Sequence, residues 1–139
     1  MLNQVHDHIV NELGHSSRTD TIFIITAILF NLIVLGINSA VSANAADDGS
    51  STASDLVLFV FIIMTIVVNL ISLSALQLGR KTRQMLLNGL VVMYSDNGVD
   101  KYYNPSLVSN YGTRYLLFAA VILVLAITSI LVPLIIRFI

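Results

Sequence analysis

Residues 56–78 form the stretch LVLFVFIIMTIVVNLISLSALQL, which contains no charged side chain. Two further stretches share this character, residues 21–43 (TIFIITAILFNLIVLGINSAVSA) and residues 115–136 (YLLFAAVILVLAITSILVPLII). A helix needs roughly 20 apolar residues to cross the hydrocarbon core of a bilayer, and each stretch is long enough. Because a backbone in lipid must satisfy its own hydrogen bonds, we expect three transmembrane helices rather than strands.

The composition of the whole chain agrees with a chain that is largely covered by lipid. Charged residues make up 11% of the 139 positions and the mean hydropathy is +0.86, whereas soluble domains carry about 25% charged residues. The net charge of −1 offers no basic surface for nucleic acid. The absence of cysteine excludes disulfides and thiolate chemistry. We therefore predict an all-α integral membrane protein with one membrane domain, residues 1–139, and no cofactor.

The basic residues predict the orientation of the chain in the membrane. Segment 79–114 carries five of them: Arg80, Lys81, Arg83, Lys101 and Arg114. Loop 44–55 carries none and has three aspartates instead. By the positive-inside rule, segments 1–20 and 79–114 are cytoplasmic, while loop 44–55 and the C-terminus are external. Arg137 then lies on the external side, where we expect it to reach the outer headgroups.

The N-terminal segment, residues 1–20, predicts a short amphipathic helix in the cytoplasmic interface. Its apolar face follows helical spacing and consists of Leu2, Val5, Ile9 and Leu13. Gly14 is expected to end this helix. Thr19 or Asp20 is then expected to cap the first transmembrane helix.

Segment 79–114 predicts a cytoplasmic helical segment that follows the second span. The helix either continues past Gly79 or bends there, and it either extends the span or lies on the membrane surface. Residues 95–98 (SDNG) indicate a turn, and Pro105 is expected in the first turn of the next helix. Two groups are expected at the lipid interface. Inner-leaflet anionic headgroups would contact Arg80, Lys81 and Arg83, and an aromatic belt would contain Tyr102, Tyr103, Tyr111 and Tyr115.

Polar side chains within the spans are the main candidate functional residues. They occupy one helical face in each of two spans: Asn31 and Asn38 in the first, and Thr65, Asn69 and Ser72 in the second. Counted from the span centres, Asn31 and Asn69 lie at nearly the same depth, so we expect them to face each other or a shared polar surface. Such amides either bond between helices within one subunit or line a polar pathway between subunits.

Three other patterns allow narrower interpretations. Ala43-Asn44-Ala45 resembles a signal-peptide cleavage site, but the apolar run before it is longer than a signal core. His8, Glu12 and His15 have the spacing of a helical metal site, although Gly14 interrupts them. In the third span, Ala119, Ala126 and Pro133 recur every seven residues and predict a packing face, with a kink at Pro133.

These observations support three functional hypotheses. The first is a non-enzymatic homo-oligomer, with a pore or ion channel lined by Asn31, Asn38, Thr65, Asn69 and Ser72. The alternative is an accessory or scaffolding subunit of a larger membrane complex. The third, a membrane enzyme, would have to use the N-terminal histidines. No Asp, Glu, Lys or His lies within a span to support a proton relay.

Overall fold

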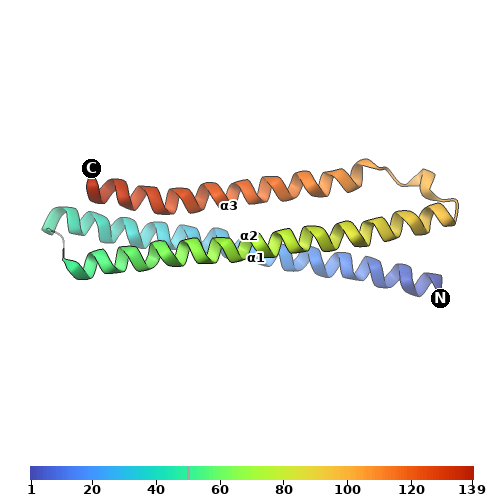
Figure 1. Cartoon of the computed structure of the whole chain (residues 1–139), viewed down its shortest axis with the longest axis horizontal. Coiled ribbons are helices and arrows are strands. Elements are labelled where there is room, and N and C mark those ends of the chain that lie inside the picture. Colours follow the sequence, from blue (N-terminus) through green and yellow to red (C-terminus); the bar gives the residue numbers. More distant parts are fainter. Residues whose placement is uncertain (50) are drawn as a thin grey trace.

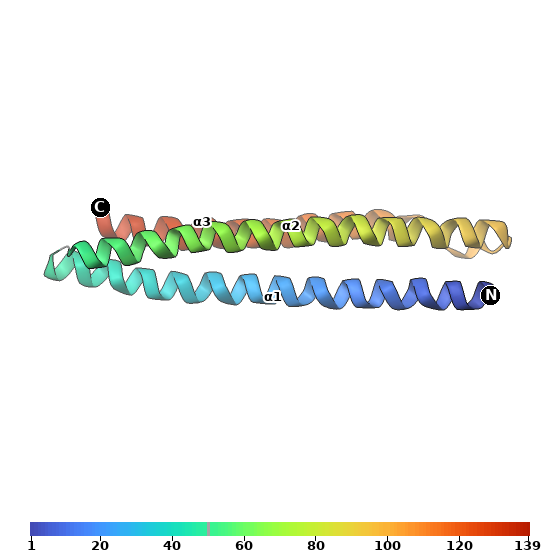
Figure 2. The same cartoon turned by 60° about the horizontal axis from the view of Figure 1, so that its bottom comes forward.

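The computed structural model describes residues 1–49 and 51–139, and it consists of three long helices (Figure 1). Helix α1 covers Leu2–Asp48, α2 covers Thr52–Asp96 and α3 covers Ser106–Phe138, while a short 3-10 helix, η1, covers Asp100–Tyr102. Helices α1 and α3 run in the same direction and α2 is antiparallel to both (Figures 1 and 2). Each helix contacts the other two, so the chain forms one elongated bundle.

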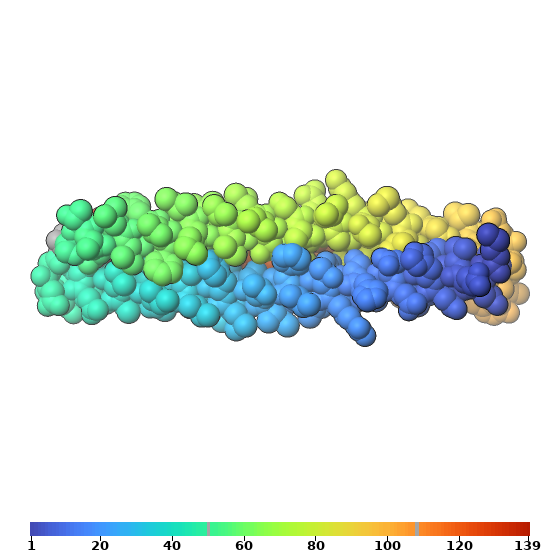
Figure 3. All heavy atoms as spheres, turned by 90° about the horizontal axis from the view of Figure 1, so that it is seen from below, coloured from blue at the N-terminus to red at the C-terminus, as the bar shows by residue number. Residues whose placement is uncertain are grey.

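All three helices are long and apolar enough to cross a membrane. Helix α1 has 47 residues and is therefore about 70 Å long, whereas the hydrocarbon core of a bilayer is about 30 Å thick. The apolar runs occupy one part of the rod. At one end of the rod, residues 2–20 and 79–114 form an extension, built from parts of all three helices and η1, that we call the stalk. In Figure 3 the side chains of α1 and α2 meet along the length of the rod.

The bundle interior follows a spacing of three and four residues along each helix. In α1 the buried positions are Asp20, Ala27, Asn31, Val34, Asn38, Ser42 and Ala45. In α3 they are Ala119, Ile122, Ala126, Ser129 and Pro133. This is the period of a coiled-coil contact line. Small and polar side chains fill it, whereas the large apolar side chains lie on the exposed faces of the helices. Small residues allow close helix approach.

The predicted break at Gly14 is wrong, because α1 is continuous from Leu2 to Asp48. A glycine inside a helix costs only about 1 kcal/mol, and contacts with α2 outweigh that cost. His6 Nε2 and the Tyr94 hydroxyl share a 3.1 Å hydrogen bond, and Ile9 packs beside Gly89. The N-terminal segment is thus the first part of the stalk rather than a separate amphipathic helix.

The expected cap at Thr19 or Asp20 is also absent, because both residues lie inside α1. Thr19 Oγ1 donates to the His15 carbonyl at 3.0 Å, as serine and threonine commonly do within helices. Asp20 turns toward α2 instead. Helix α2 passes Gly79 without ending, so segment 79–96 extends the second span in the direction of the stalk.

The connections are shorter than predicted. Helices α1 and α2 leave only residues 49–51 of the expected loop 44–55 between them, and Ser50 lies outside the described residues. At the other end α2 stops at Asp96, and Gly98 has a φ of 68°, as the SDNG turn predicted. Pro105 immediately precedes α3, and Asn104 Oδ1 accepts a hydrogen bond from the Ser106 amide.

Candidate functional site

The paired amides of Asn31 and Asn69 join α1 to α2 in the middle of the bundle. Each side chain donates from Nδ2 to the other's Oδ1, and both distances are 2.8 Å. Asn69 Nδ2 also donates to the Thr65 carbonyl at 2.7 Å, so it is held from two directions. The contact expected from the matching depths is therefore present. It satisfies four polar groups that would otherwise be buried at a cost among apolar side chains.

The other predicted polar residues lie on the same internal surface. Thr65, Ser72 and Asn38 are all at most 4% exposed, as measured within a single chain. Thr65 Oγ1 donates to the Phe61 carbonyl at 2.7 Å. We call the five residues Asn31, Asn38, Thr65, Asn69 and Ser72 the polar surface. All of it faces the inside of the bundle, while the exposed sides of the spans carry large apolar side chains.

Buried side-chain atoms without a hydrogen-bond partner gather around Asn38. Its Nδ2 and Oδ1 are buried without a hydrogen-bond partner among the described residues, and so is the Ser42 hydroxyl. Ala27 of α1 and Ile122 of α3 pack in one cluster. Asn38 and Pro133 lie the same number of residues further along their helices, so the parallel course of α1 and α3 brings them to the same level. Proline has no N–H, so the Ser129 carbonyl loses its helical donor there. Separately, Ser129 Oγ donates to the Ala126 carbonyl at 2.9 Å.

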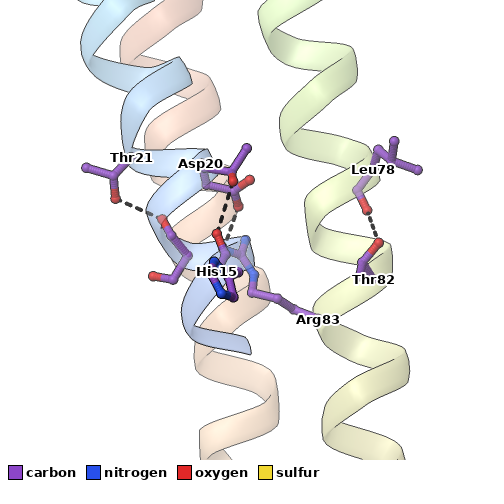
Figure 4. Close-up of polar contacts among 8 residues, drawn as sticks. His15, Asp20, Thr21, Leu78, Thr82 and Arg83 are labelled. Atoms are coloured by element: carbon purple, nitrogen blue, oxygen red, sulfur yellow. Dashed lines mark hydrogen bonds and ion pairs between the residues drawn. The ribbon is translucent and has the colours of Figure 1, made fainter. Parts of the chain in front are cut away.

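A second group of polar residues lies where the apolar runs meet the stalk. Asp20 of α1, which precedes run 21–43, forms an ion pair with Arg83 of α2, and the distance from Oδ2 to the guanidinium is 2.5 Å (Figure 4). Both side chains are almost buried, 8% and 12% exposed. Burial raises the pKa of the Asp20 carboxyl, and this effect exceeds the opposing attraction of Arg83.

Gly79 makes room for this ion pair. A Cβ at position 79 would overlap Asp20 Oδ1 and would lie 3.0 Å from Oδ2. Gly79 and Arg83 are one helical turn apart, so they present one face of α2 to the carboxylate. Gly79, where the sequence allowed a bend, thus permits the Asp20 carboxylate to lie close to the backbone of α2.

Aromatic rings of α3 complete this region. The Arg83 guanidinium carbon lies 5.8 Å from the centroid of the Tyr111 ring, and that of Arg80 lies 5.0 Å from the Tyr115 ring. These distances are within the range of cation–π attraction. We call the four charged residues Asp20, Arg80, Arg83 and Arg114 the arginine cluster. Sequence analysis assigned Arg80, Lys81 and Arg83 to lipid headgroups, but of these three only Lys81 is exposed.

A seven-residue spacing in the sequence could have predicted the Asp20–Arg83 contact. Asn69, Leu76 and Arg83 follow one another at seven-residue steps, and so do Asp20, Ala27 and Val34. Extending each contact line from the span into the stalk would have brought the two charges to the same interface. The assumed helix break at Gly14 concealed this continuity.

The opposite end of the bundle carries another ion pair. Arg137 of α3 bonds to Asp55 in the first turn of α2, and the Arg137 side chain is only 6% exposed. The prediction that Arg137 reaches the outer headgroups is therefore wrong. Asp55 pairs with Arg137 instead. This contact could not be predicted from the sequence because it depends on how α2 and α3 pack together.

The tyrosines divide into two groups. Tyr111 and Tyr115 lie beside the arginine cluster, but Tyr103 packs against Tyr94 at the far end of the stalk, with ring centroids 5.7 Å apart. Burial raises the pKa of the Tyr103 phenol, with further contributions from Tyr111 and Tyr94. Tyr102 is 79% exposed. Of the four tyrosines expected in an aromatic belt, Tyr111 and Tyr115 lie closest to the apolar runs, and the belt itself stays a prediction.

No group of three or more His, Asp or Glu residues with metal-binding geometry occurs in segments 1–49 and 51–139. His8 and His15 are both exposed on α1. Comparison with protein-family models, with curated proteins and with solved structures gives no match for this chain.

Proposed function

We propose that the chain is a non-enzymatic accessory or scaffolding subunit, which anchors a rigid helical stalk to the membrane and presents it to other chains. The observation that carries this proposal is the continuity of α1 and α2 from the apolar runs into the stalk. The Asp20–Arg83 and His6–Tyr94 contacts hold the two helices together along this length. By the positive-inside rule the stalk projects into the cytoplasm.

The arrangement of the polar surface favours this function over a pore. Asn31 and Asn69 use their amides on each other, and the five polar residues are enclosed by the helices of one chain. A pore between copies would have to separate α1 from α2 and break these bonds. The outer faces of the spans are suited to lipid or to apolar helices of partners instead.

The stalk offers exposed apolar side chains to a partner. Met85 is 68% exposed, Val92 is 59% exposed and Tyr102 is 79% exposed. Outside the hydrocarbon core such side chains have no lipid to cover them, and exposed apolar groups in water mark interaction surfaces when they cluster. This supports a partner that contacts the stalk as well as the spans.

Site-specific photocrosslinking in the native membrane tests the proposal. A photoreactive benzoylphenylalanine replaces Met85 or Tyr102 in the stalk, and Leu29 serves as the control because it is exposed within a span. We expect the stalk positions to give a discrete crosslink to a different polypeptide. The purified chain should leave planar bilayers without conductance.

Two results would overturn the proposal in favour of a pore. One is crosslinking of the stalk to copies of the same chain alone, in a closed ring of defined mass. The other is an ion conductance of the purified chain that changes when Asn31 and Asn69 are both replaced by leucine.

A further inference from the structure

A small cavity lies between the three helices beside the arginine cluster. Its volume is about 60 Å³, and its lining includes the polar residues Ser17, Asp20, Thr21, Arg83, Tyr111 and Arg114. All three helices contribute, so the cavity exists only in the assembled bundle. Asp20 is buried and Arg114 is exposed, so the cavity reaches from the surface of the rod to the buried ion pair.

The charges around this cavity do not balance. Two arginines, Arg83 and Arg114, line the cavity together with the single carboxylate of Asp20, and Arg80 lies nearby over the Tyr115 ring. Asp20 forms its ion pair with Arg83, which leaves the positive charges of Arg80 and Arg114 without an acidic partner among the described residues. Charges in a partly desolvated place are unfavourable without a counterion. The region therefore favours the entry of an anion.

Unused hydrogen-bond donors point to the same conclusion. The Nε of Arg83, which lines the cavity, is buried and has no hydrogen-bond partner within segments 1–49 and 51–139, and the same is true of Arg80 Nε outside the lining. A guanidinium presents five N–H donors in a plane, which matches the oxygens of a phosphate or carboxylate. The hydroxyls of Ser17 and Tyr111 add further polar groups to the lining.

The position and size of the cavity select the kind of anion. Asp20 directly precedes apolar run 21–43, and Arg114 directly precedes run 115–136, so the cavity lies at the level of lipid headgroups. A water needs ~10–15 Å³ of such volume, so the cavity holds about four to six water-sized atoms. A phosphate group has four oxygens, whereas a whole headgroup with its glycerol would extend past Arg114.

We propose that this cavity binds the phosphate group of an anionic lipid, with Arg83 and Arg114 as the principal ligands. The lipid would lie against the spans with its phosphate between α1 and α3, and would hold the three helices together where the stalk leaves the membrane. This inference does not depend on the proposed function. It would apply to a pore or to a scaffold with the same bundle.

Native mass spectrometry of the full chain in mild detergent tests the proposal. The probes are dioleoylphosphatidic acid, dioleoylphosphatidylcholine as the zwitterionic control with no net charge, and inorganic phosphate to distinguish a free anion from a lipid. Arg114→Gln removes one ligand from an exposed position and leaves the Asp20–Arg83 pair intact. Lys81→Gln is the matched control, because it removes the same charge from an exposed residue near the same level.

We expect phosphatidic acid to bind about tenfold more tightly than phosphatidylcholine, and Arg114→Gln to weaken it by about tenfold, since hydrogen bonds to charged groups are the strong ones. Lys81→Gln should weaken binding less than about twofold. Arg114→Lys should give an intermediate loss, because lysine keeps the charge without the planar fork.

Each outcome decides the proposal. Arg114-dependent binding of inorganic phosphate would support the phosphate site and identify a free anion as its source. Equal losses from Arg114→Gln and Lys81→Gln would overturn it, because they would show a diffuse attraction between basic residues and anionic lipid. Binding that Arg114→Gln and Arg114→Lys both leave unchanged would overturn it as well.

Discussion

The Asn31 and Asn69 side chains exchange two hydrogen bonds of 2.8 Å across the interface of α1 and α2. This is the only reciprocal amide pair within residues 1–49 and 51–139, and it lies inside the apolar runs. Interhelical hydrogen bonds in membranes contribute about 0.6 kcal/mol on average and up to about 1.7 kcal/mol. The pair also fixes the register of α1 against α2, because a shift of either helix would separate both bonds.

Replacing either amide of the pair alone should destabilise the bundle, and the two replacements should not be additive when combined. Asn31→Leu leaves the Asn69 amide buried with an unused donor and acceptor, so we expect a loss of about 1–2 kcal/mol in the free energy of unfolding. Asn31→Leu combined with Asn69→Leu should lose less than the two single changes added together. Unfolding in mixed detergent micelles measures all three.

Asn44→Leu is the control for this series, because Asn44 is exposed near the end of α1. It should change the free energy of unfolding by less than about 0.5 kcal/mol. Strict additivity of the two single losses would contradict a direct bond between Asn31 and Asn69.

Gly79→Ala should destabilise the bundle although alanine is the better helix former. The added methyl group would overlap the Asp20 carboxylate, which is held by Arg83 and has little room to move. We expect a loss of about 1–3 kcal/mol, as is usual for overpacking. Gly14→Ala is the matched control, because nothing lies within 4 Å of a Cβ at that position. It should stabilise the stalk by up to about 1 kcal/mol. Equal effects of the two changes would refute the close approach of Asp20 to α2.

The Asp20–Arg83 pair should matter most when only one partner is removed. Arg83→Met leaves the Asp20 carboxylate buried and unpaired, which costs about 3–5 kcal/mol in comparable cases. Asp20→Leu combined with Arg83→Met removes both charges and should restore most of the stability. Thermal unfolding of the full chain in detergent measures the difference, and Lys81→Met serves as an exposed control. A double variant as unstable as Arg83→Met alone would contradict this prediction.

The orientation of the bundle can be measured directly, because the chain has no cysteine of its own. Asp47→Cys places a thiol at the short α1–α2 connection, and Tyr102→Cys places one at the far end of the stalk. Both positions are exposed. By the positive-inside rule, a membrane-impermeant maleimide should label Asp47→Cys in intact cells and Tyr102→Cys only after permeabilisation. The opposite pattern would place the stalk outside the cell.

Much of the architecture followed from residue type and spacing. The three uncharged runs predicted three membrane-length helices, because a backbone in lipid has no other way to satisfy its polar groups. The matching depths of Asn31 and Asn69 predicted their contact, because a helix rises by a constant amount per residue. The SDNG turn and Pro105 predicted where α2 ends and where α3 begins.

The tertiary structure decided the features that depend on two helices at once. The sequence around Gly14 predicted a break, but contacts with α2 keep α1 continuous, since local propensities are smaller than packing energies. Asp20 pairs with Arg83, and Arg137 pairs with Asp55. In both pairs the partners lie far apart in the sequence. Which charge meets which is set by helix register and rotation, and those are properties of the packed bundle. Composition and periodicity therefore determined the spans, while the assembled helices determined the ion pairs and the cavity between them.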